Sequence, residues 1–354
     1  MRRALFILAS IIATCVSAAA TAPAPVSDTA IMAATPAPLL SAYRLFQDAA
    51  ARTPNARVTP YELNTALYSD GALKLRYVYM PAGARARYDS AGVFGFPVGT
   101  VLVKTFAFAA DMRSPDQNVR FIETRLLIRR EAGWVALPYV WNDAQTEARL
   151  SVIGADVPVR FTDAEGQALA LDWAVPNVNE CRGCHLRDGV IEPIGPRARN
   201  LNRDGQMQLW LAAGLLDGLP ANSAMPRVPN AYDASSGALD ARARAYLDVN
   251  CAHCHNPAGP AHTSGLDLSW SQDNPAQWGV RKRPVAAGRG SAGYEFSIEP
   301  GHPERSILLH RMESTDPGVM MPELGRQLAD ARALALMRAW IAAMDAQGRP
   351  APHD

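Results

Sequence analysis

Two short cysteine motifs constrain this chain more than any other feature of its sequence. Cys181-Arg-Gly-Cys184-His185 and Cys251-Ala-His-Cys254-His255 each place a histidine directly after the second of two closely spaced thiols. This spacing is typical of covalent haem attachment, because two thiols can form thioethers to the vinyl groups of one porphyrin while the histidine ligates its iron. We therefore expect two covalently attached haem c groups, each with its iron. The expected residues are the thioether cysteines Cys181, Cys184, Cys251 and Cys254 and the proximal ligands His185 and His255.

A zinc site or a redox dithiol is the alternative use of the same cysteines. Two CxxC pairs could supply four zinc ligands, but zinc does not require the histidine that follows each pair. The chain has five cysteines. Cys15 lies in the N-terminal apolar segment, so the other four are all in the two motifs and none remains for a structural disulfide. An oxidising compartment also disfavours a standing dithiol.

The N-terminus predicts export. Arg2 and Arg3 precede the uncharged apolar run 4–16, and small residues follow at 17–20. Residues 1–20 are therefore predicted to be a Sec-type signal peptide, which places the protein in the periplasm. Lipid anchoring at Cys15 is a weaker alternative, because Thr14 is a poor residue before a lipidated cysteine. No later segment is apolar for long enough to span a bilayer, so the mature chain should have no transmembrane segment.

Length and composition indicate a globular protein of several domains. The chain has 354 residues, of which 48% are apolar and 19% charged, and its formal net charge is +1. This balance gives no reason to expect nucleic acid as a partner. Residues 21–38 are rich in Ala, Pro and Thr and predict a flexible leader. Residues 39–176 predict a β-rich domain, residues 177–236 a first haem domain and residues 237–350 a second.

Strand-like runs separated by turn residues fill the β-rich region. The runs are 74–80, 98–107, 120–129 and 134–140, and they predict a sandwich or barrel. The region 58–176 contains neither Cys nor His, so we expect no metal or haem site inside it. Helices are predicted after it at 204–216, 239–249 and 327–344.

The mature chain resembles a family of bacterial dihaem c-type cytochromes of uncharacterised role. The phrases that carry this resemblance include Pro60-Tyr-Glu-Leu-Asn64, Phe96-Pro-Val-Gly-Thr100, Leu137-Pro-Tyr-Val-Trp-Asn142, Ile194-Gly-Pro196 and Met321-Pro-Glu-Leu-Gly325. The resemblance implies a multidomain fold, in which two mainly α, class I cytochrome c-like domains follow the β-rich domain. It also implies that a carbonyl of the Ile194–Pro196 loop accepts the proximal histidine N–H.

The same resemblance suggests the distal iron ligands. Met321, in a Met-Pro loop before the last expected helix, is the expected distal ligand of the second haem, with Met320 as alternative. Met225, followed by Pro226, is the weaker candidate for the first haem, with Met207 or an open position as alternatives. His302 and His310 are candidates for bis-histidine ligation, and His253 is expected at the surface.

These expectations favour an electron-transfer protein over a catalytic oxidoreductase. Its partners would be periplasmic redox proteins, and its assembly would require the cytochrome c maturation machinery. One alternative is a peroxidase-like dihaem enzyme with one open iron. The other is a ligand-binding or sensing module whose haems report redox state.

Overall fold

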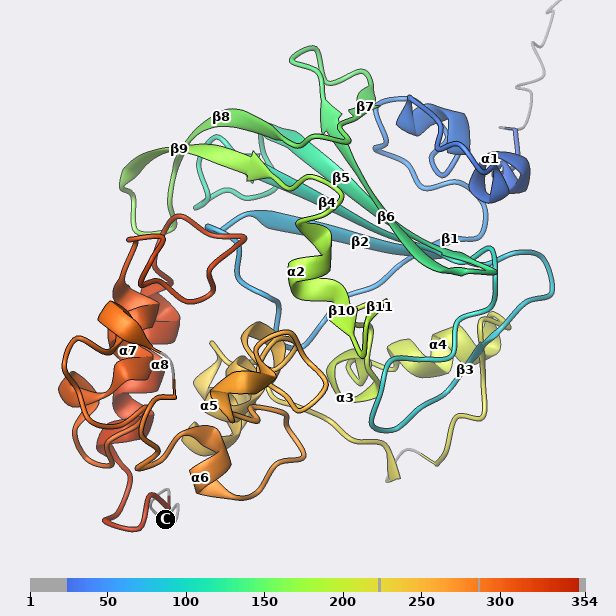
Figure 1. Ribbon diagram of the computed structural model, residues 1–354. Coiled ribbons are helices and arrows are strands. Elements are labelled where there is room, and N and C mark those ends of the chain that lie inside the picture. The colour runs from blue at the N-terminus through green and yellow to red at the C-terminus, as the bar shows by residue number, and fades with distance from the viewer. Residues whose placement is uncertain (1–23, 222–223, 286, 350–354) are drawn as a thin grey trace, which may run out of the picture.

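A six-stranded antiparallel sheet organises the protein. The computed structural model describes residues 24–221, 224–285 and 287–349. The sheet has the strand order β1-β2-β4-β5-β6-β7, and Figure 1 shows α2 lying next to it. Its strands are β1 (Val58–Pro60), β2 (Leu73–Tyr79), β4 (Val101–Ala109), β5 (Val119–Arg130), β6 (Gly133–Trp141) and β7 (Ala148–Leu150). The four strand-like runs of the sequence thus correspond to β2, β4, β5 and β6.

Most of the remaining elements are short, apart from the hairpin strands β8 and β9 and the helices α5 and α8. The further strands are β3 (Ala86–Arg87), β8 (Ala155–Thr162), β9 (Ala168–Val175), β10 (Leu186–Arg187), β11 (Val190–Ile191) and β12 (Leu216–Asp217). The α-helices are α1 (Asp28–Met32), α2 (Cys181–His185), α3 (Ala198–Leu201), α4 (Gln206–Ala212), α5 (Leu239–Asn250), α6 (Pro275–Trp278), α7 (Ile307–Glu313) and α8 (Ala331–Ala342). Strands β8 and β9 form a hairpin, and β3 pairs in parallel with β12.

One face of the sheet is an apolar core. Side chains alternate between the faces of a strand, and one set from β2, β4, β5 and β6 packs against the N-terminal segment. The hydroxyl groups of Tyr43, in the N-terminal segment, and Tyr139, on β6, share a 2.9 Å hydrogen bond. Ile31, on α1, is fully buried in this core. The described part of the expected flexible leader, residues 24–38, therefore includes a helix that packs on the sheet, because Val26 and Ile31 supply apolar surface to bury.

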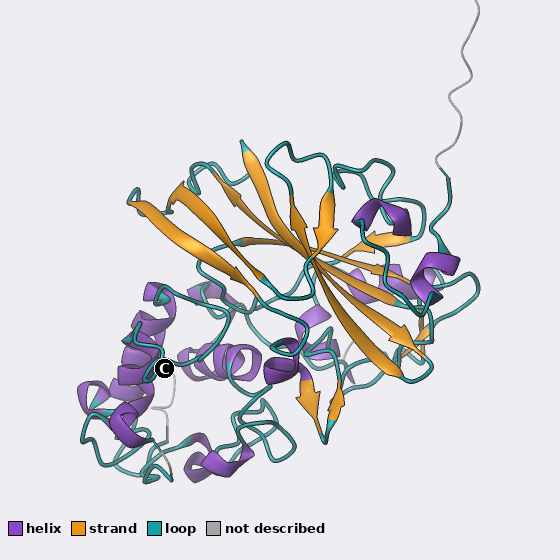
Figure 2. Ribbon diagram, turned by 45° about the horizontal axis from the view of Figure 1, so that its top comes forward, coloured by secondary structure: helices purple, strands orange, loops and turns teal. Residues whose placement is uncertain are grey.

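The opposite face is divided into three parts. Phe106, Phe108 and Ile122 pack under the β8–β9 hairpin at one end. At the other end, Leu102 and Val78 join a cluster that contains residues of α3 and α4. The middle of this face is open and forms the wall of a cavity. Figure 2 shows the strands fanning out, with most of the helices gathered beside the sheet.

The C-terminal part is built on two helices of 12 residues, α5 and α8. Asp330 caps α8 by accepting a 3.0 Å hydrogen bond from the Ala333 N–H, which satisfies a free donor of the first turn. Trp340 of α8 is fully buried and donates a 2.8 Å hydrogen bond to Asp240 of α5. Helix α5 closely matches the predicted helix 239–249, whereas α4 and α8 are shorter than the predicted helices 204–216 and 327–344.

The expected fold class is wrong. The chain is predominantly β-sheet with few helices, and residues 177–349 do not form two mainly α, cytochrome c-like domains. The β-rich part is also an open sheet that ends at β1 and β7, with a separate hairpin, and not a sandwich or barrel. The misjudgement has a physical cause: the helices after residue 176 are short, and long loops join them, so helical periodicity extends over few residues.

The predicted signal peptide, residues 1–20, and Cys15 lie outside the described residues. Among the residues that the structure describes, no helix has the length and hydrophobicity needed to cross a membrane. This agrees with the expectation of no transmembrane segment in the mature chain. The domain boundaries at 176 and 236 stay predictions.

Candidate functional site

The first motif forms the short helix α2, which follows β9 after a connection of five residues, 176–180. Cys181 is buried. The β10–β11 hairpin follows and turns the chain back, so that the Glu192 carbonyl lies 2.8 Å from His185 Nδ1. Burial lowers the pKa of His185 to about 4, so its imidazole is neutral. The Nδ1–H therefore donates to this carbonyl and Nε2 is left as the available metal ligand. The expected acceptor, a carbonyl of Ile194–Pro196, is replaced by Glu192.

The second motif follows α5 without a break. The Cys251 N–H donates a 2.9 Å hydrogen bond to the Leu247 carbonyl, which ends the helix. His255 Nδ1 lies 2.9 Å from the Ser264 hydroxyl oxygen, and burial lowers the pKa of His255 to about 4. This histidine is also neutral and oriented through Nδ1. Burial raises the pKa of the Cys251 thiol to about 12.

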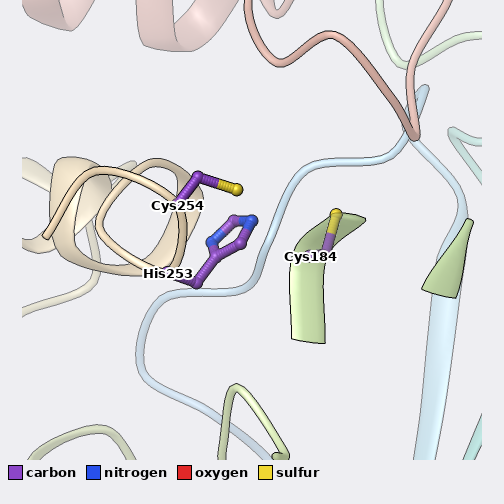
Figure 3. Close-up of side chains that lie close together, drawn as sticks. All are labelled: Cys184, His253 and Cys254. Carbon is purple, nitrogen blue, oxygen red and sulfur yellow. The ribbon is translucent and has the colours of Figure 1, made fainter. Parts of the chain in front are cut away.

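The two motifs, far apart in sequence, lie side by side. The ligand atoms of Cys184, His253 and Cys254 are all within 4.8 Å of one another. Figure 3 shows His253 and Cys254 projecting from the loop after α5 toward Cys184. Cys254 Sγ is 3.6 Å from the Gly183 carbonyl oxygen. The Cys254 thiol is the main cause that lowers the pKa of Cys184.

A buried ion pair helps to hold the motifs together. Arg199 of α3 donates two hydrogen bonds, of 2.8 and 2.9 Å, to the carboxylate of Asp248 on α5. Both side chains are nearly inaccessible to solvent. A bidentate buried pair of this kind fixes two elements in one orientation. It joins the segment after the first motif to the helix before the second.

A cavity of about 300 Å³ lies beside the first motif. Cys181, Cys184 and His185 line one side of it, and the open middle of the sheet lines another. His253 of the second motif also reaches it. The cavity walls from the sheet are mainly apolar, with Leu102, Phe106, Leu127, Ala136 and Pro138 among them.

Three cations interrupt this apolar wall. Arg76, Lys104 and Arg125 all line the cavity. Sequence reasoning missed them, because a region without Cys or His was expected to hold no part of a haem site. The signal was present: each cation occupies a position in an apolar strand whose neighbours in sequence face the buried core.

The sequence-predicted distal ligands fall into different surroundings. Met225 is buried with Met207 and Trp210 in the cluster beside α4, and it does not line the cavity. The Met321 N–H donates to the Arg311 carbonyl. Met320 is buried and Met321 half-buried. Pro322, the next residue, lines the cavity of the first motif. This arrangement does not test Met225 as the distal ligand of the first haem or Met321 as that of the second, and both stay predictions.

The candidate histidines outside the motifs do not converge on either site. His302 is exposed and pairs with Glu304 at 3.2 Å. His310 lies on α7 with its ring 6.0 Å from that of Tyr294. His253, expected at the surface, is half-buried, and its Nδ1 is buried without a hydrogen-bond partner in the described part of the chain.

The residues around the first motif fit a haem. The group has an apolar macrocycle, two carboxylates and an iron that takes a neutral imidazole. The cavity offers apolar walls, cations and a neutral, oriented histidine beside two free thiols. Its volume is within the range of ligand pockets. The donor set of the second motif is the same in kind.

Comparisons with known proteins give no relative. No family model matches the chain, and neither does any curated protein or solved structure. The resemblance to a family of dihaem c-type cytochromes is therefore wrong as an assignment, since neither the comparisons nor the strand-rich fold supports it. What the sequence retains is two CxxCH motifs on a different architecture.

Proposed function

We propose that this protein binds two haem c groups covalently and transfers electrons between redox partner proteins in the periplasm. The single observation that supports it most is the contact between the motifs, with Cys254 Sγ 3.6 Å from the Gly183 carbonyl oxygen. Two haems held by adjacent cysteines would be close neighbours. Because electron tunnelling weakens steeply with distance, such neighbours can exchange electrons efficiently.

The chain's own residues would hold and tune the irons. When bound, each haem supplies a reversible one-electron couple. The Glu192 carbonyl orients His185 and the Ser264 hydroxyl orients His255, which fixes each ring and presents Nε2. A hydrogen bond from Nδ1–H also raises the basicity of the ligand. The low pKa of both histidines keeps them neutral and ready to bind a metal.

The first test counts haems and asks whether they interact. The full chain is produced with a c-type maturation system, alongside Cys181→Ala/Cys184→Ala and Cys251→Ala/Cys254→Ala. Intact mass should show two haems in the wild type and one in each double variant. Optical redox titration should then show that loss of either haem shifts the midpoint potential of the other, because adjacent charges interact. A chain without covalent haem, or two haems with independent potentials, would contradict the proposal.

Carbon monoxide distinguishes the carrier from the enzyme. An electron carrier should have both irons closed, so the reduced protein should show no spectral change with carbon monoxide. A change that corresponds to one haem would mean an open iron and would favour the peroxidase-like alternative. The one-haem variants would then assign that iron to His185 or His255.

The cluster of Cys184, His253 and Cys254 supports a second candidate, a protein metal site. Three such donors within 4.8 Å are a ligand set that zinc accepts. This candidate and thioether formation exclude each other, because both use the thiols of Cys184 and Cys254. Metal analysis of the matured protein decides: one zinc and no haem supports the metal site, and two haems without zinc supports the proposal.

A further inference from the structure

The three cavity cations stand in one row across three strands. Arg76 of β2 is directly opposite Lys104 of β4, and Lys104 is directly opposite Arg125 of β5. Residues opposite each other on one face have neighbouring side chains, and like charges in such pairs destabilise a sheet. A row of three buried or half-buried cations therefore needs negative charge nearby.

In the described part of the chain, Arg125 is the cation of the row that has a closely paired carboxylate. Arg125 forms an ion pair with Glu123, which is fully buried and also accepts a 2.8 Å hydrogen bond from Trp173. With that carboxylate assigned to Arg125, the other two cations depend on weaker contacts.

Arg76 and Lys104 are left without such a partner. Arg76 Nη2 is buried and has no hydrogen-bond partner among the described residues. Arg76 Nη1 donates a 3.1 Å hydrogen bond to the Lys74 carbonyl, and the carboxylate of the exposed Glu62 is 3.9 Å from it. Lys104 Nζ lies 4.7 Å from the centre of the Phe106 ring, and it makes no hydrogen bond or ion pair with any residue that the structure describes. Burial lowers the pKa of Lys104 well below its ordinary value, which is what an uncompensated cation produces.

Among the described residues, no carboxylate therefore pairs closely with Arg76 or Lys104, and the rest of the cavity wall that the sheet provides is mainly apolar. A ligand that fits must combine an apolar body with carboxylates. His185 and the two thiols of the first motif line the same cavity, which ties the cation row to whatever those thiols attach.

We propose that Arg76, Lys104 and Arg125 form a carboxylate-binding site that holds the propionate groups of the haem attached to Cys181 and Cys184. The inference rests on the proposed function. It adds that the sheet, which carries no iron ligand of either motif, binds one haem by its acidic edge. It also distinguishes the two haems, since the row lies beside the first motif.

The test measures the potential of the His185 haem in Lys104→Met. A propionate carboxylate stabilises ferric iron, and a paired cation offsets this, so loss of Lys104 should lower the midpoint potential of that haem. Lys104→Arg should restore it. Arg120→Met removes a cation from another part of β5, where Arg120 pairs with Asp143 at 3.0 Å, and should leave the potential unchanged. Arg76→Gln is the second variant and should lower the potential in the same direction.

Haem count separates the two proposals. Two haems per chain with an unchanged potential in both Lys104→Met and Arg76→Gln would overturn the inference and leave the proposed function standing. A chain without haem would overturn both. If Lys104→Met instead gains carbon monoxide binding, Lys104 is an iron ligand and the propionate assignment is wrong.

Added acetate and phosphate distinguish the haem's own carboxylates from a free anion. If propionates occupy the row, neither salt should give a saturable change in the wild-type spectrum or potential beyond the effect of ionic strength. A saturable change that Lys104→Met abolishes would show that the row is open to a free anion, and would overturn the assignment to propionates.

Discussion

The two faces of the central sheet are built from the same strands and differ in almost every physical respect. Toward the N-terminal segment, β4 presents Val101, Val103 and Ala107, all buried in one apolar core. Toward α2 it presents Leu102, Lys104 and Phe106, which line the cavity. One face buries apolar surface and stabilises the fold. The other keeps unpaired charge in a cavity, which costs stability and is expected where a ligand binds.

The largest effect on the free energy of unfolding should come from placing a lysine at position 103, one residue before Lys104 and on the other face of β4. Val103 is 1% exposed and belongs to the apolar core beneath the N-terminal segment. Val103→Lys should therefore lower the free energy of unfolding by roughly 3–5 kcal/mol, the usual consequence of an uncompensated buried charge. Urea unfolding followed by circular dichroism measures it. Lys104→Met, at the adjacent position on the other face, should not lower it, because the change removes an unpaired cation from a buried site. Equal losses would mean that the two faces do not differ as described.

The sequence predicted where the strands of this sheet lie, but not that their side chains form part of the candidate site. Alternation and turn residues located β2, β4, β5 and β6, because strand periodicity is a local property of the chain. The wall that Lys104 and Arg125 add to the site of His185 depends on how β5 and α2 meet, and no local pattern encodes that contact.

Because local patterns do not encode long-range contacts, the contact between the two motifs was also not predicted. Each CxxCH motif is a local signal and was read directly from the sequence. The approach of Cys254 to Gly183 is a long-range contact, as is the buried pair of Arg199 and Asp248 that joins the neighbouring segments. The members of that pair are ordinary charged residues when read alone. The cytochrome c-like fold was inferred from a resemblance and not from periodicity, and the short helices did not support it.

An intermediate effect should separate two neighbouring leucines of β5. Leu126 is fully buried in the apolar core, whereas Leu127 is half-buried in the cavity wall. Leu126→Ala should cost about 2–5 kcal/mol of unfolding free energy, with or without haem, because it leaves a cavity in a close-packed core. Leu127→Ala should cost about 1 kcal/mol in the haem-free Cys181→Ala/Cys184→Ala background. It should cost more when the first haem is attached and covers it. Denaturant unfolding of the two leucine variants, each with and without the first haem, tests this. A loss of unfolding free energy in Leu127→Ala that is the same in both backgrounds would place the haem elsewhere.

The smallest effect concerns Lys74, one row away from the three cations on the same face. Burial, assisted by the nearby charge of Arg76, lowers the pKa of Lys74 from 10.5 to about 7. Below pH 7 both the folded and the unfolded chain carry the proton, and the folded state bears the full cost of burying it. Between pH 7 and 10.5 only the unfolded chain is protonated, so the contribution of Lys74 to stability rises with pH.

Lys74→Met should therefore be more stable than the wild type at pH 6, and its advantage should shrink as the pH rises toward 10. The effect is limited because Lys74 Nζ donates a 3.2 Å hydrogen bond to the Ala72 carbonyl and the side chain is only half-buried. Urea unfolding of both proteins at several pH values gives the difference directly, with Lys282→Met, in a loop outside the sheet, as the baseline. A difference that stays constant across this range would show that Lys74 is neutralised by its surroundings. The cationic face would then be confined to the row that lines the cavity.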